Sequence, residues 1–450
     1  MQAFLSTVNS YIVLPALMVL LAMLLGARPG EALRGGLHIC VALVGVGMLF
    51  SFFLGKAQPI LLALMRITGK QAGITDVGWP QLSMLVWTLQ ASYLIIPIAF
   101  GVNLGMVALG WTRTVNVDIW NFWHIAVAGF LVYAQTESLP LAAAADALMT
   151  VVTLKLADWI KPALEQTYAL DGNMTISTMN SLTYLPLALL VNRLLDLLPS
   201  VGRPGRPTGR GGSGRAFLDT GVLSLLVGFV VALIARRPLH EAVDFSASTA
   251  AVFLLLPGVV SFMKSGFRPV TDATERFVKR LFRGRREIVV GVNHMILSDN
   301  PSVVVSAILL MPIAIAMSLL LPWVEIFPMA DLTNIVCLIV TIVAVCRGDV
   351  VRSVLTGIPA LLLCLVCSSY VAPLYTRMGA VLGVPSAVPG LWAASVNGNN
   401  YLSVWVAELL MGRPWALASL PVALLAGYAC RRYCAAARQR AAHVADSSTE

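Results

Sequence analysis

The chain has 450 residues, of which 58% are hydrophobic and only 12% are charged, and its net charge is +9. About a quarter of the residues of a soluble domain are charged, so this composition excludes a water-soluble protein and predicts an integral membrane protein. The basic residues are concentrated in the polar connections and near the C-terminus. This is the positive-inside bias of membrane proteins, and it argues against a nucleic-acid interface.

Long apolar runs occur along the whole chain, and a helix needs about 20 such residues to cross a bilayer. The first run, 11–26, follows neither a basic segment nor a small-residue cleavage site, so we expect a retained helix rather than a signal peptide. The later runs are 37–54, 82–110, 117–135, 139–160, 180–199, 217–235, 247–262, 302–322, 333–346, 350–372, 387–411 and 415–430. We predict an all-α polytopic membrane protein with about ten or eleven transmembrane helices. Runs that are too short or too polar to cross are expected to form re-entrant or hairpin segments.

A segment rich in Gly, Pro and Arg, 200–216, divides the chain near its middle and is predicted to be a flexible basic loop. It separates an N-terminal transmembrane half, 1–199, from a C-terminal half, 217–430, and a tail follows at 431–450. Two helix sets of similar size around a central break are typical of transporters with an internal repeat. Within the second half, the basic segment 264–287 is interpreted as an amphipathic helix that contacts lipid headgroups or a cytosolic partner. The positive-inside rule places both basic segments and the tail in the cytoplasm.

The stretch "NVDIWNFWHI", residues 116–125, is unusually polar for this chain. On a helix with ~100° per residue, His124 and Gln135 lie within about 20° of each other, Asn121 lies about 60° to one side and Asp118 about 120° away. Polar groups in a bilayer normally face a bundle interior or an aqueous cavity, so we predict that Asn121, His124 and Gln135 form one wall of a binding site. Amide and imidazole groups suit an uncharged polyhydroxylated ligand. The alternative is that His124 only bonds a neighbouring helix.

Further polar residues interrupt other apolar segments and are candidates for the opposing walls of the site. The run "NGNN", 397–400, is typical either of a helical hairpin tip within the membrane or of an ordinary turn outside it. The candidate residues in these segments are Asp76, Gln90, Asn300, Asp331, Asn397 and Asn399.

Motifs of several enzyme classes are absent from the sequence. It has no Walker A, HExxH or GxSxG pattern, so we predict no catalytic nucleophile, metal site or cofactor. The pair Cys364 and Cys367 lies in an apolar run without flanking charge and is expected to serve packing. Carboxylates within helices, at Glu137, Asp146 and Asp158, keep a proton-coupled secondary transporter of a small polar solute as the alternative function.

Several motifs resemble one known family across essentially the whole chain. The most specific is "TRTVNVDIWNFWHI" (112–125), with "DVGWP" (76–80), "FPMADL" (327–332), "CRGDVVRS" (346–353) and "SVNGNNYLSVW" (395–405). The chain resembles the galactitol-type IIC component, the membrane permease of the bacterial phosphoenolpyruvate-dependent phosphotransferase system, in the ascorbate-galactitol group.

The resemblance implies a homodimer in the bacterial inner membrane, with a substrate-carrying core that moves against a dimerising scaffold. It implies that galactitol or a similar polyol is carried to the cytoplasm and phosphorylated there. The phosphoryl donor would be a phosphocysteine on a separate IIB component, which is charged through IIA, HPr and enzyme I. This chain carries no IIB-like domain, so its own contribution would be to position the substrate hydroxyl.

Overall fold

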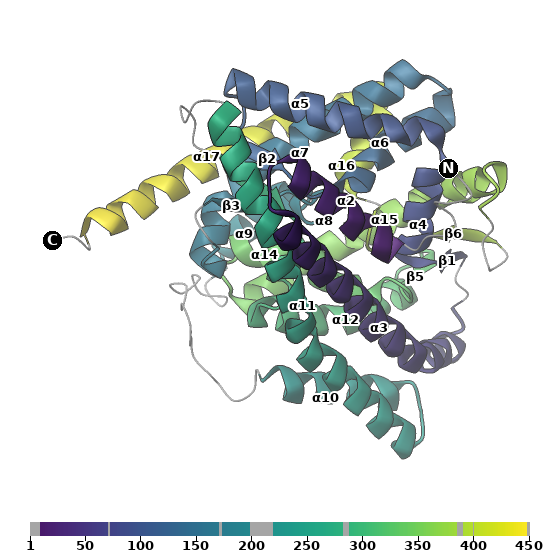
Figure 1. The fold of residues 1–450 in the computed structure, drawn as a ribbon. Coiled ribbons are helices and arrows are strands. Elements are labelled where there is room, and N and C mark those ends of the chain that lie inside the picture. Colours follow the sequence, from purple (N-terminus) through teal and green to yellow (C-terminus); the bar gives the residue numbers. More distant parts are fainter. Residues whose placement is uncertain are drawn as a thin grey trace.

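The computed structural model describes residues 10–70, 73–170, 173–198, 219–281, 288–384, 390–398 and 400–447. Helices dominate the fold, which confirms the prediction of an all-α polytopic protein (Figure 1). Six helices among these residues are long and apolar enough to cross a membrane, and four shorter apolar helices accompany them. The loop predicted at 200–216 lies outside the described residues.

The first half of the chain alternates long helices with very short strands and short helices. Its elements, with η denoting a 3₁₀ helix, are α2 (Ser10–Leu24), α3 (Pro29–Thr68), β1 (Ile74–Asp76), α4 (Gly78–Thr88), η1 (Gln90–Leu94), α5 (Ile95–Leu109), β2 (Thr114–Asn116), α6 (Asn121–Thr136), α7 (Leu139–Tyr168), β3 (Met174–Ile176), α8 (Met179–Leu182) and α9 (Leu185–Leu195).

The second half has the same alternation. Its elements are α10 (Thr220–Ile234), α11 (Leu239–Leu281), β4 (Val289–Val292), η4 (His294–Leu297), α12 (Pro301–Leu320), β5 (Ile326–Phe327), η5 (Leu332–Asn334), α13 (Ile335–Leu338), α14 (Val340–Val345), α15 (Val350–Val381), β6 (Leu391–Ala393), α16 (Tyr401–Leu410) and α17 (Pro414–Ser447).

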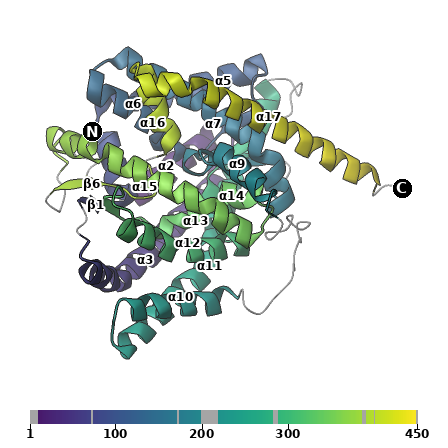
Figure 2. The same ribbon diagram turned by 180° about the vertical axis from the view of Figure 1, so that it is seen from behind.

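The two halves of the chain share one order of elements. Each half opens with a 15-residue helix, α2 or α10, followed by a helix of 40 residues, α3, or 43 residues, α11. In each half, three strands follow in turn, separated by long helices. The equivalent helices α3 and α11 pack against each other and lie at the front of Figure 1, whereas α15 and α17 cover the opposite side (Figure 2).

The strands form two parallel three-stranded sheets in which the halves interlock. The sheet orders are β5-β1-β6 and β2-β4-β3, so each central strand comes from one half and both of its neighbours come from the other. The sheets lie on opposite sides of the bundle (Figure 1). Because of this exchange, neither half can complete its own sheet, and the two halves fold as one unit.

The basic segment predicted as an amphipathic helix is not a separate element in its described part. Residues 264–281 continue α11 without a break. Val270, Ala273 and Thr274 are buried on one face of this part, whereas Asp272 and Arg276 are exposed on the other. The segment is therefore amphipathic, and its apolar face packs within the protein. Residues 282–287 lie outside the described residues.

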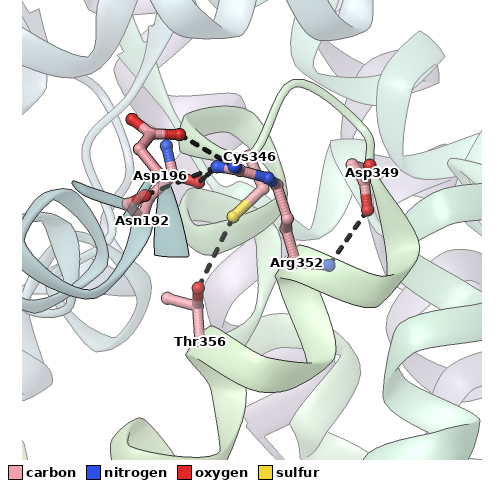
Figure 3. Close-up of polar contacts among 6 residues, drawn as sticks. All are labelled: Asn192, Asp196, Cys346, Asp349, Arg352 and Thr356. Carbon is pink, nitrogen blue, oxygen red and sulfur yellow. Dashed lines mark hydrogen bonds and ion pairs between the residues drawn. The ribbon is translucent and has the colours of Figure 1, made fainter. Parts of the chain in front are cut away.

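A fully buried cation holds the start of α15 against the end of α9 (Figure 3). The guanidinium of Arg352 donates to the side-chain oxygen of Asn192 at 2.7 Å and to the carboxylate of Asp196 at 2.8 Å. Asp349 caps the same helix by accepting from the Arg352 backbone N–H at 2.9 Å. The Arg352 side chain has no solvent exposure, whereas that of Asp196 is 47% exposed.

We predict that Arg352→Ala lowers the free energy of unfolding by about 3 kcal/mol, since it removes the hydrogen bonds of a buried guanidinium to Asn192 and Asp196 and opens a cavity. Thermal unfolding of the purified protein in detergent measures the loss. Arg193→Ala, which removes an exposed guanidinium from α9, is the matched control and should change the midpoint little. Equal midpoints for the two variants would contradict the structural role of Arg352.

Candidate functional site

Each of the six strands ends in a turn inside the protein, and a helix begins after it. Because the strands of each sheet are parallel, their carboxyl ends meet at one edge. Non-helical backbone at membrane depth is tolerated only where its polar groups find partners within the protein or line a cavity. The side chains that accept hydrogen bonds from the backbone N–H groups of these turns therefore hold the interior of the molecule together.

The carboxylate of Asp76 joins the three turns of the sheet β5-β1-β6. It accepts from the backbone N–H groups of Gly78 at 3.0 Å, Met329 at 2.9 Å, Asp331 at 3.0 Å and Ser395 at 3.1 Å. The Ser395 hydroxyl adds a bond of 2.7 Å. One carboxylate thus satisfies donors that follow three different strands.

Asp331 is the second acceptor in this cluster, and its partners among the described residues are N–H donors. One oxygen accepts from Trp79 N–H at 3.0 Å and from the Asn334 amide at 2.8 Å, and the other accepts from Asn397 N–H at 2.8 Å and Val396 N–H at 3.4 Å. Because only donors face both oxygens, the carboxylate form fits this site. The bonds fix the turn that carries Asn397.

Asp118 has the corresponding position at the sheet β2-β4-β3. Its carboxylate accepts from the Thr178 hydroxyl at 2.8 Å and from the Asn293 amide at 3.1 and 3.2 Å. Thr178 in turn accepts from His294 N–H at 3.0 Å. These bonds join the turns after β2, β3 and β4, so Asp118 anchors the polar stretch 116–125.

The two clusters meet in the middle of the molecule. His124 of α6 is 2.7 Å from Asn397, measured from Nε2 to Oδ1, so a residue that follows β2 contacts one that follows β6. Gly398 next to it has φ +93°, and an added Cβ would lie 2.8 Å from the ring of Trp123, so only glycine fits there. Asn397 is 5% exposed, so the turn between β6 and α16 lies inside the protein.

Several buried polar atoms around this junction have no hydrogen-bond partner among the described residues. They are both ring nitrogens of His294, both amide atoms of Asn180, His124 Nδ1 and Trp123 Nε1. Each such group costs about 1–3 kcal/mol if left unsatisfied. The His294 ring is buried and has no carboxylate partner among the described residues, and burying an unpaired charge is costly, so the neutral imidazole fits this position. The junction therefore offers uncharged donors and acceptors to a ligand.

Some predicted site residues have their hydrogen-bonding capacity engaged by the protein. Asn121 donates to the Ser177 carbonyl at 2.5 Å and accepts from Met179 N–H at 2.8 Å, which fixes the start of α8. Asn300 caps α12 by accepting from Ser302 N–H at 3.0 Å. These two asparagines act on the backbone next to the site.

Other predicted residues lie apart from the junction. Gln135 shares a helix face with His124 but is 11 residues, about 16 Å, farther along α6. Its amide donates back to the Leu131 carbonyl of its own helix at 3.1 Å. Gln90 is exposed at the start of η1. Asn399 lies outside the described residues.

Sequence reasoning did not select Asn180 and His294. The repeat contains a signal for Asn180, because Asn180-x₃-Tyr184 matches Asn397-x₃-Tyr401 and the two tyrosine rings lie 6.0 Å apart. Likewise, Asp118-x₂-Asn121 matches "DLTN", 331–334. A comparison of the two halves of the sequence would have pointed to these turns.

The carboxylates considered for proton coupling have local roles. Asp146 accepts from Gly129 N–H at 3.0 Å, and Asp158 accepts from the Thr114 hydroxyl at 2.8 Å. Glu137 is exposed and ends α6 with φ 55°. Within the described residues, no group of three or more His, Cys, Asp or Glu side chains could hold a metal ion.

Comparison with known proteins gives one consistent family. Residues 3–386 match the family model of the sugar-specific permease component of the PTS system, EIIC-GAT. The chain is 27% identical over 402 residues to the galactitol-specific EIIC components of the PTS system of Escherichia coli K12 and O157:H7, which covers 88% of this chain and 87% of each relative. A putative permease IIC component of Escherichia coli K12 is 23% identical over 410 residues, 90% of this chain and 93% of that protein.

We predict that Asp331→Asn destabilises the protein by about 1–3 kcal/mol, because the amide nitrogen would face N–H donors that now have an acceptor. Thermal unfolding in detergent should show a lower midpoint. Asp272→Asn removes an exposed carboxylate of α11 and serves as the control. If Asp331→Asn unfolded at the wild-type temperature, the proposed role of this carboxylate as a buried acceptor would be wrong.

Proposed function

Because the chain belongs to the family of sugar-specific permease components of the phosphotransferase system, whose members are multi-pass inner-membrane proteins, we propose that it transports galactitol or a similar polyol. The name of the relatives in Escherichia coli, galactitol-specific EIIC component, supports this substrate class. The alternative of a proton-coupled carrier has no comparable support, since Asp146 and Asp158 are engaged in hydrogen bonds with the protein.

The observation that carries the proposal is the set of neutral, buried and unpartnered polar groups at the junction of the two clusters. Every hydroxyl of a sugar alcohol is both a donor and an acceptor and needs both kinds of partner once it leaves water. The imidazole of His294 and the amide of Asn180 supply both kinds. The nearby carboxylates of Asp76, Asp118 and Asp331 are already occupied by N–H and O–H donors, so they add no free charge that would select an ionic ligand.

We assign two roles to the residues of this region. His124, Asn180, His294 and Asn397 contact the polyol, and Trp123 offers an indole N–H beside them. Asp76, Asn121 and Asp331 hold the turns that carry these groups. Holding one hydroxyl in line for attack on a phosphoryl group is a positioning contribution, which is what this reaction type demands of a protein.

The partners follow from the same family membership. The phosphoryl donor is a phosphocysteine of a separate IIB component, supplied by IIA, HPr and enzyme I. The chain acts as a homodimer in which the interlocked sheets belong to the mobile core. Its basic segments and the tail face the cytoplasm, where IIB approaches, in line with the positive-inside rule.

Substitution of the unpartnered groups should weaken polyol binding without lowering the unfolding temperature. We predict that Asn180→Leu and His294→Leu each weaken polyol binding at least tenfold and leave the unfolding temperature unchanged or higher, because an apolar group of similar size removes an unsatisfied buried one. Asn121→Leu should instead lower the unfolding temperature, since it breaks two bonds to the backbone. Thermal shift with and without galactitol measures both effects. Wild-type binding by both leucine variants would refute the assignment.

The coupling can be tested in membrane vesicles that contain this chain. We predict that uptake of radiolabelled galactitol requires phosphoenolpyruvate with enzyme I, HPr, IIA and IIB, and that the sugar alcohol accumulates as its phosphate. A protonophore should then have little effect on uptake. Accumulation of unmodified galactitol that collapses with the proton gradient would favour the secondary transporter.

A further inference from the structure

A basic groove lies where the start of α3 crosses α11. Its volume is about 640 Å³, and its polar lining comes from Arg28, Arg34, His38, Ser265 and Arg268, together with the acidic Glu31. α3 and α11 lie at the front of the molecule in Figure 1. The groove plays no part in the proposed transport site.

Two glycines bring the helices together beneath the groove. A Cβ at Gly35 would lie 2.9 Å from the Gly266 carbonyl oxygen, and one at Gly266 would lie 2.8 Å from that of Gly35. Close contact of the backbones is possible only without side chains at these positions. Beside this crossing, His38 Nδ1 and Ser265 Oγ are 2.8 Å apart, which joins the two walls of the groove.

The groove has an excess of positive charge. Arg28 is 3.7 Å from Glu31, and their side chains are 86% and 53% exposed, so this pair is open to solvent. Arg34 and Arg268 are exposed, and within the described part of the chain neither has an ion-pair partner. Three guanidinium groups thus face one carboxylate, an arrangement that suits a phosphate group.

An apolar stripe continues from the groove along α3. At ~100° per residue, Leu37, Val41 and Met48 lie within about 60° of Arg34 on the helix surface. Their side chains are exposed, at 62%, 43% and 68%. The stripe from Arg34 to Met48 is 14 residues, about 21 Å, long, which compares with about 15 Å for the hydrocarbon of one leaflet.

We propose that this groove is a binding site for an anionic phospholipid. Its phosphate lies between Arg34 and Arg268, Arg28 provides further positive charge at the helix start, and the acyl chains lie along the stripe. Basic pockets between membrane helices are suited to such headgroups. The stripe favours a lipid over a free phosphate ion, because acyl chains can pack against an exposed apolar surface and an inorganic ion cannot.

The test is retention of phosphatidylglycerol by the purified full-length chain, measured by native mass spectrometry and by thermal shift against phosphatidylcholine. We expect wild type to retain phosphatidylglycerol selectively and Arg34→Gln/Arg268→Gln to bind it at least tenfold more weakly. The control is Arg66→Gln/Arg432→Gln, which removes the same charge from exposed positions elsewhere and should bind as wild type does. Gly30→Glu is a second test variant, since a Cβ there meets nothing within 4 Å and an acidic residue is favourable in a first helical turn. It should lose retention as well.

Three outcomes would overturn the proposal. The first is equal retention by wild type and both test variants. The second is stabilisation by millimolar inorganic phosphate but not by phosphatidylglycerol, which would identify a site for a free anion. The third is loss of the dimer in the test variants while they still retain lipid. This would mean that the groove faces a second copy of the chain.

Discussion

The rest of the interior depends on the hydrogen bonds that the carboxylate of Asp76 accepts from buried backbone N–H groups. Three segments of chain stop being helical inside an apolar bundle, and each leaves backbone N–H groups that the hydrocarbon cannot satisfy. A carboxylate can accept several such bonds at once, and Asp76 does so for residues that follow β1, β5 and β6. Asp118 does the same for the other sheet. The turns between them therefore have fixed positions, although no long element supports them.

Two kinds of polar side chain lie close together in this region: those that bond to the protein and those that have no partner in it. Asn121 and Asp331 have their hydrogen-bonding atoms turned to the protein, and substituting them changes the shape of the site. His294 and Asn180 lie in adjacent turns, but their side-chain atoms have no partner within the described residues. A buried group that the fold leaves unsatisfied costs stability, and the proposed polyol would supply the missing partners of both side chains.

The shared order of elements in the two halves explains why the turns of the two sheets meet within the molecule. Exchange of central strands between the halves places the turns of each sheet opposite those of the other, and pairs of equivalent residues such as Tyr184 and Tyr401 come into contact there. Equivalent positions do not keep equivalent chemistry. Asn397 bonds His124, whereas the side chain of Asn180, its counterpart, has no partner among the described residues. We propose that this asymmetry leaves one side of the junction open to a ligand.

The sequence by itself determined the membrane class and drew attention to the polar stretches "NVDIWNFWHI" and "NGNN", because polar residues within apolar runs are visible locally and are costly in hydrocarbon. It also selected Asp76, His124 and Asn397 as members of one region. Only the tertiary structure decided which of the polar residues bond to the backbone and which remain open, since hydrogen-bond partners such as His124 and Asn397 are 273 residues apart. Helix periodicity grouped Gln135 with His124 by angle, whereas distance along the helix separates them. The physical reason is that a pattern fixes the face of a helix, and only packing fixes what lies opposite that face.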